Sequence, residues 1–239
     1  MATLHFLANP ARFRRFSQRA LPVLSMGTAL ALAAGLYLAL VQSPPDYQQG
    51  ETVRIMFVHV PSAWLAMAGY GLLAALGASL LVWRHPLAAL MARGAAPVGA
   101  VFAAVCLITG SLWGRPMWGT YWVWDARLTS MLLLFFLYLG HIALSRAYDD
   151  PDRGDRAAAV LALVGAINLP VIKFSVDWWN TLHQPASVMK LGGPSIHPAI
   201  LTPLLVMAGA LLLLFVVLVL LRTETEIDRR RLEAAEFAG

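Results

Sequence analysis

Six long apolar runs constrain the fold of this chain more than any other feature. They cover residues 21–41, 57–83, 95–113, 128–146, 157–173 and 198–221. A helix needs about 20 predominantly apolar residues to cross a hydrocarbon core of about 30 Å. Lipid offers no hydrogen bonds to a peptide backbone, so such runs fold as helices. The sequence therefore predicts an all-α integral membrane protein, with residues 1–239 forming one six-span domain.

The composition supports this class. Charged residues make up 13% of the chain, whereas they make up about 25% of a soluble domain. The first run is longer than the apolar core of a signal peptide, so we expect a retained helix that ends at Ser43-Pro44-Pro45. The fifth run is short and is interrupted at residues 168–170 by Asn-Leu-Pro.

The distribution of cations predicts the orientation of the spans. Of the 18 lysines and arginines, 13 lie in the N-terminal segment, in residues 84–93 and 146–156, and in the C-terminal tail. Cytoplasmic connections are enriched in these residues. We therefore expect both termini in the cytoplasm of a bacterium and the connection between spans three and four on the periplasmic face of the inner membrane. The arginines flank apolar runs, so the net charge of +5 does not indicate nucleic-acid binding.

Several kinds of chemistry are excluded. Cys106 is the one cysteine, which rules out an internal disulfide, a C-x-x-C redox pair and covalent attachment of haem at C-x-x-C-H. The chain has two lysines, Lys173 and Lys190, and neither lies in the glycine frame of a phosphate-binding loop. Any ATP-driven work must therefore come from another chain.

A tryptophan-rich segment, residues 113–130, joins spans three and four. It contains Trp113, Trp118, Trp122 and Trp124, which are four of the eight tryptophans. An aromatic belt would populate both membrane interfaces, but seven of the eight fall on the outward half. Although some rings also anchor the helices, we predict a flat platform for a planar, apolar, doubly anionic ligand, namely haem. If residues 118–129 are helical, Trp118, Trp122 and Asp125 share one face.

Two histidines at the outer edge are candidate ligands of haem iron. His59 and His183 come from different segments, and each has tryptophan nearby. Two neutral imidazoles are a ligand pair that a six-coordinate haem iron accepts. His197 is a reserve candidate. We expect His141, in span four, to be buried and hydrogen-bonded to a neighbouring helix, although an ionisable residue within a membrane is also a functional candidate.

The two propionates of haem require cationic partners. Arginine can hold a carboxylate through two parallel hydrogen bonds, and Arg54 and Arg127 lie at the edge of the predicted platform. The alternative for each is an interfacial arginine that extends its charge to water. A negative charge facing a porphyrin would be unfavourable, so we expect Asp125 to orient a neighbouring group.

At these residues the sequence resembles the WWD family of haem-handling membrane proteins of cytochrome c biogenesis. Within it, the chain is most similar to the small six-span haem exporter C (CcmC) proteins. The matching text is WGRPMWGTYWVWDARLTS at 113–130, FVHVPSAW at 57–64 and WWNTLHQPAS at 178–187. With length and topology, the resemblance covers essentially the whole chain.

The resemblance implies a function in haem delivery rather than in catalysis. Members bind haem b transiently at the periplasmic surface through the WWD segment and two histidines, which correspond here to His59 and His183. They present it to a membrane-anchored haem chaperone (CcmE). They work with an ABC-type ATPase (CcmA), its membrane subunit (CcmB) and a small single-span protein (CcmD), so ATP hydrolysis is expected on a separate chain.

Two other functions stay open at this point. A b-type electron-transfer cytochrome would bury haem between helices, where this chain offers only His141. A haem-free permease subunit or docking scaffold would use the tryptophans to bind a periplasmic partner. An autonomous enzyme is disfavoured because the outward segments contain no nucleophile–base pair. Few polar residues lie within the spans, which favours presentation of haem at the surface over passage through a pore.

Overall fold

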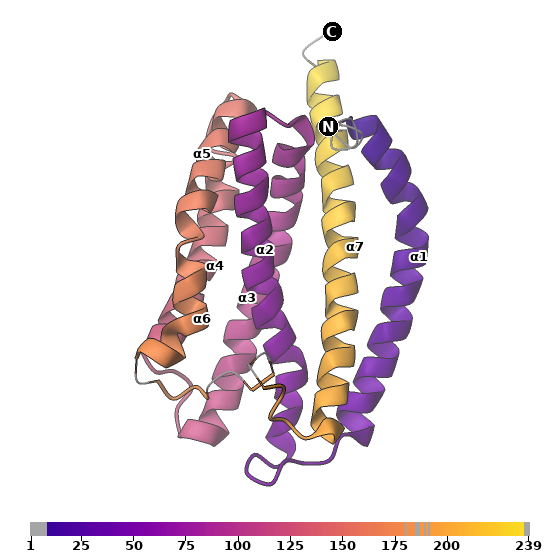
Figure 1. Ribbon diagram of the computed structural model, residues 1–239. Coiled ribbons are helices and arrows are strands. Elements are labelled where there is room, and N and C mark those ends of the chain that lie inside the picture. The colour runs from indigo at the N-terminus through magenta and orange to yellow at the C-terminus, as the bar shows by residue number, and fades with distance from the viewer. Residues whose placement is uncertain (1–8, 180, 185–186, 189, 191, 237–239) are drawn as a thin grey trace.

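The computed structural model describes residues 9–179, 181–184, 187–188, 190 and 192–236, and these form a bundle of long helices (Figure 1). The helices are α1 (Pro10–Tyr37), α2 (Met56–Trp83), α3 (Pro86–Trp118), α4 (Ala126–Leu144), α5 (Pro151–Gly165), α6 (Asn168–Trp178) and α7 (Pro198–Glu236), with a π-helical turn η2 (Leu38–Gln42) and a 3-10 turn η3 (Glu51–Ile55). Within the described residues, six helical units are long and apolar enough to cross a membrane, which confirms the predicted six-span all-α fold.

Most of these units extend beyond the apolar runs that predicted them. The third, for example, begins at Pro86, where proline suits the first helical position because its missing N–H would have no partner there. It ends where Gly119 adopts a left-handed conformation with φ 78°. This helix therefore continues past both ends of the predicted span, from Pro86 to Trp118.

The fifth unit is two helices in sequence. Backbone helicity stops at Gly165 and resumes at Asn168, and Pro170 lies in the first turn of α6, where its missing N–H costs no helical hydrogen bond. The buried Asn168 amide donates to the Ser130 carbonyl of α4 over 2.8 Å. The interruption is thus satisfied by a side chain, and α6 packs against α4 while α5 packs against both α2 and α4.

Tyrosines fill the centre of the core, and each has a partner for its hydroxyl. Tyr138 donates to the Ala66 carbonyl over 2.7 Å, and Tyr70 donates to the Leu161 carbonyl over 3.2 Å. Their rings meet edge to face with centroids 5.1 Å apart. These contacts join α2, α4 and α5, whereas α7 lies between α1 and the α2–α3 pair (Figure 1).

The start of α1 and the end of α7 lie at the same end of the bundle (Figure 1). This end is rich in arginine. There the buried Arg93 and Asp155 form an ion pair at 2.5 Å, and Asp155 also pairs with Arg230 of α7. Arg14 of α1 pairs with Asp228 of α7 at 2.8 Å. These bonds fasten the polar extension of α7 to the rest of the bundle.

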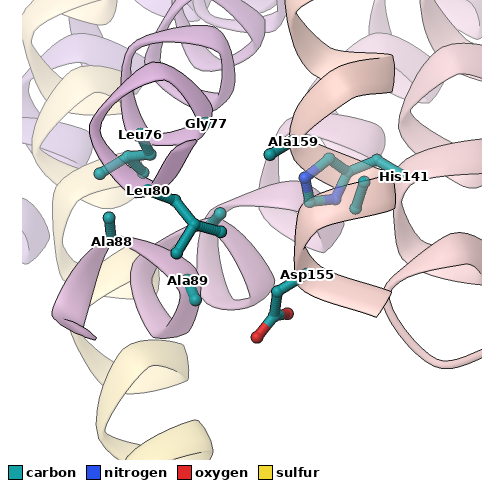
Figure 2. A pocket seen from close by; sticks show the side chains of 10 residues that line it. Leu76, Gly77, Leu80, Ala88, Ala89, His141, Asp155 and Ala159 are labelled. Atoms are coloured by element: carbon teal, nitrogen blue, oxygen red, sulfur yellow. The ribbon is translucent and has the colours of Figure 1, made fainter. Parts of the chain in front are cut away.

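His141 lies near this ion-paired cluster, beside a void of about 10 Å³ (Figure 2). Its ring is buried, as predicted, but Nδ1 finds no hydrogen-bond partner among the described residues. Small apolar residues such as Gly77, Ala89 and Ala159 line most of the void, and the Asp155 carboxylate that also borders it is paired with arginines. The predicted helix-to-helix hydrogen bond is therefore not made through this nitrogen.

Candidate functional site

A cavity of about 650 Å³ opens at the opposite, tryptophan-rich end of the bundle. Helices α2, α3, α4 and α6 and the start of α7 line it, together with residues 46–49 and 182–184. Pockets that hold cofactors and drug-sized ligands occupy about 300–1,000 Å³. The cavity therefore has the size of a cofactor site, and it lies where helices far apart in the sequence converge.

The cavity gathers six of the nine predicted binding residues, and its lining leaves out Trp124, Asp125 and Arg54. Its lining includes His59, His183, Trp113, Trp118, Trp122, Arg127 and the reserve candidate His197. Trp124 does not line it, because its side chain is 76% exposed and packs edge to face on Trp122. Arg54 is also absent from the lining.

The aromatic platform is not the helical face that residues 118–129 would form. Helix α3 ends at Trp118, and α4 begins only at Ala126. The residues between them are non-helical because Gly119 reverses the chain and Asp125 caps α4, its Oδ1 accepting from the Leu128 N–H over 2.7 Å. A turn, rather than helical periodicity, therefore places Trp118 and Trp122 in the same cavity.

The protonation of His59 follows from its contacts. Its Nδ1 lies 3.1 Å from the Cys106 carbonyl oxygen and 3.1 Å from Thr109 Oγ1, both on α3. A carbonyl oxygen can only accept, so Nδ1 must carry the proton. The lone pair of the neutral ring is then on Nε2, the nitrogen that remains available to a metal.

His183 has the same arrangement with a different partner. Its Nδ1 lies 3.4 Å from Asp125 Oδ2, and an ionised carboxylate only accepts, so Nε2 again carries the lone pair. The ring packs edge to face on Trp118, with centroids 4.9 Å apart. Burial lowers the pKa of His183, although the neighbouring Asp125 opposes that shift. The balance favours the neutral imidazole, which is the form that binds metals.

Two buried donors in the lining have no partner among the described residues. They are Nε1 of Trp122 and Nε of Arg127. Arg127 Nη2 donates to the backbone carbonyls of Ile172 and Lys173 over 3.4 and 3.2 Å, which brings this arginine beside a second cation of the lining, Lys173. Buried polar groups are normally satisfied, so these donors suit an anionic ligand edge.

Arg54 makes its hydrogen bonds at the end of the first span, away from the lining of the cavity. Its Nη1 donates to the carbonyls of Ala39 and Leu40 in η2, at 2.9 Å for Ala39, and its Nε pairs with Glu51 at 2.5 Å. Carbonyls at a helix C-terminus lack intrahelical partners. The guanidinium therefore closes the end of the first span instead of reaching the cavity.

Sequence reasoning also missed residues that the cavity includes. Lys173 is one of two lysines and lies at the end of an apolar run, and that isolated cation was the available signal. Gln49 had no such signal. It accepts a hydrogen bond from Trp113 Nε1 over 3.1 Å, which ties the connection before α2 to the platform.

The fold and this site together define a multi-pass helical membrane protein whose aromatic cavity presents two imidazole nitrogens. A family model described as Heme exporter protein C matches residues 3–238. The chain belongs to this Heme exporter protein C family.

Similar proteins of that printed name include one from Bradyrhizobium diazoefficiens, 61% identical over 98% of this chain and 89% of the relative. One from Escherichia coli is 46% identical over 92% of this chain and 89% of its own length. One from Paracoccus denitrificans is 43% identical over 95% and 94%. Their shared name describes a transport protein and not an enzyme.

Proposed function

We propose that this chain binds haem b non-covalently in the cavity and delivers it for cytochrome c maturation. The observation that carries the proposal is the pair of histidines in one cavity, each with Nδ1 engaged by an acceptor and Nε2 left available. Metal-binding histidines normally donate their other ring N–H to a carbonyl or carboxylate in this way. The names of the relatives support haem as the cargo.

In this proposal different residues of the lining bind different parts of the haem. His59 and His183 bind the iron from opposite sides, while Trp113, Trp118 and Trp122 pack against the macrocycle. Arg127 and Lys173 receive the propionates, and the unsatisfied Trp122 Nε1 is a further donor in the lining. Asp125 holds the His183 ring in the required tautomer. Trp124, exposed at the rim, lies outside the binding surface.

The two histidines lie on different structural elements, and this arrangement provides a way to release the haem. His59 stands on the first turn of α2, whereas His183 stands on the connection between α6 and α7. A small separation of these elements would break one bond to iron and weaken the hold on the other. Two neutral ligands on separate elements therefore suit a protein that must orient its cargo and then give it up.

The proposal places the chain in a bacterial inner membrane with both termini cytoplasmic and the cavity open to the periplasm. The excess of cations at the arginine-rich end supports this orientation. There the chain would load a membrane-anchored haem chaperone, CcmE, in a complex with the ABC subunits CcmA and CcmB and the small CcmD. ATP would be hydrolysed by CcmA.

The test is chaperone loading in cells that carry His59→Ala or His183→Ala in the assembled complex. We expect each variant to lower the covalent haem recovered on the chaperone by at least tenfold, because a six-coordinate site loses one ligand. His85→Ala is the matched control, since His85 lies at the other end of the bundle, at the start of α3. Parental loading by both variants would refute the proposal.

A further inference from the structure

Two glycines one turn apart on α3 lie against aromatic rings of the cavity. A Cβ on Gly110 would stand 2.8 Å from Cε1 and 3.4 Å from Nδ1 of His59. A Cβ on Gly114 would stand 3.1 Å from Cε3 of Trp118 and 3.2 Å from the Thr120 carbonyl oxygen. Carbon atoms in contact prefer about 3.5–4.0 Å. The absence of a side chain at each position is therefore what lets these rings approach α3.

The His59 ring cannot yield to a side chain at Gly110 without losing its hydrogen bonds. Its two acceptors, the Cys106 carbonyl and Thr109 Oγ1, belong to the same helix as Gly110, so movement away from the glycine is movement away from them. Trp113 also packs edge to face on the His59 ring, with centroids 5.6 Å apart. Residues 106, 109, 110 and 113 form one stripe of α3 by helical spacing.

Gly114 affects the position of His183 through the Trp118 ring. The Trp118 ring that lies over Gly114 is the ring that packs on His183. A displaced Trp118 would carry the imidazole away from Asp125, which already contacts Nδ1 over a long 3.4 Å.

Glycines four residues apart in membrane helices commonly allow two helices to pack closely, and other glycines of this chain serve that purpose. A Cβ on Gly77 would meet the backbone of Ala159, at 3.1 Å from its carbonyl oxygen, and a Cβ on Gly94 would meet the backbone N of Thr223 at 2.8 Å. At Gly110 the nearest atoms are all in the His59 ring, and at Gly114 the nearest is in the Trp118 ring. These two positions are shaped by the site.

We propose that Gly110 and Gly114 are positioning residues that set where the two imidazoles stand, one directly and one through Trp118. The inference rests on the proposed haem binding. It assigns α3 a specific task, which is to hold the His59 ring directly, and the His183 ring through Trp118, against one helical face.

The experiment titrates the detergent-purified chain with haemin and records the visible spectrum of the parent and of Gly110→Ala and Gly114→Ala. We expect each variant to bind haemin roughly 10–100-fold more weakly, the range found when groups supporting a metal ligand are removed, and to lose the six-coordinate low-spin bands. Added imidazole should restore those bands in Gly110→Ala, because it supplies the missing ligand.

Matched controls come from the same chain. Gly27→Ala in α1 and Gly209→Ala in α7 make the same change in helices, at positions where a Cβ meets nothing within 4 Å. Thr109→Val removes one acceptor of His59 without adding bulk, so it tests the position of the His59 ring even if Gly110→Ala fails to fold. Thr109→Ser keeps the hydroxyl and should bind haemin like the parent.

The outcomes separate the two claims. Parental affinity and spectrum in Gly110→Ala, Gly114→Ala and Thr109→Val would overturn this inference and leave the proposed function in place. Absence of haemin binding in the parent and both controls would overturn the proposed function and this inference with it.

Discussion

At the scale of single residues, Asp125 performs two tasks with its two oxygens. Oδ1 caps α4 by accepting from Leu128 N, and Oδ2 faces Nδ1 of His183. We predict that Asp125→Asn weakens haemin binding roughly 10–100-fold. Asparagine can still cap the helix, but an amide NH₂ facing Nδ1 would favour the opposite tautomer and place the proton on Nε2.

The measurement is a haemin titration of the purified variant beside Asp46→Asn. Asp46 lines the cavity, and its Oδ1 accepts from the backbone N–H groups of Gln48 and Gln49, a task that asparagine retains. Equal affinity of Asp125→Asn and the parent would show that the contact with His183 does not orient the ring.

Single residues also show how much of the site could be predicted from the sequence. His59 and His183 were predicted as candidates because histidines beside tryptophans at membrane edges are chemically conspicuous. Their tautomers were not predictable, because the acceptors are a backbone carbonyl 47 residues away for His59 and an aspartate 58 residues away for His183. Arg54 and Arg127 have the same chemistry in the sequence, and only tertiary contacts separate the arginine that closes a helix from the one at the cavity.

At the scale of elements, Arg54 links the end of the first span to the start of the second. We predict that Arg54→Gln lowers the stability of the detergent-purified chain by about 1–3 kcal/mol, the cost of leaving the carbonyl of the buried Ala39 without its donor. Its haemin spectrum should stay that of the parent because Arg54 does not line the cavity. The check is a thermal unfolding curve with a parallel spectrum.

Arg127→Gln provides the contrast within the same experiment. Because Arg127 lines the cavity, this substitution should lower haemin affinity. A loss of affinity in Arg54→Gln with unchanged stability would restore Arg54 as a ligand-binding residue and contradict its assignment to the helix end.

The elements also show why hydropathy predicts helices better than it predicts the site. Six apolar runs were sufficient for the all-α fold, because a membrane leaves the backbone few alternatives. The predicted connection between spans three and four is present, but the shared helical face considered for residues 118–129 does not form, because α3 ends at Trp118 and α4 begins at Ala126. Gly119, in its left-handed conformation, and the Asp125 cap are the local chemistry that overrides that periodicity.

At the scale of the whole molecule, the two ends of the bundle differ in chemistry. The arginine-rich end is closed by the buried pair of Arg93 and Asp155, and the void beside it is only about 10 Å³. The opposite end opens into a cavity of about 650 Å³ lined by rings and two available imidazole nitrogens. This asymmetry supports a protein that holds its cargo at one membrane face.

We propose that the Nε2 atoms of His59 and His183 together bind haem iron. The most direct measurement is the absorption and electron paramagnetic resonance spectrum of the detergent-purified parent chain loaded with haemin. We predict a six-coordinate low-spin spectrum typical of two imidazole ligands. A five-coordinate high-spin spectrum, or the absence of stoichiometric haemin binding, would contradict the account.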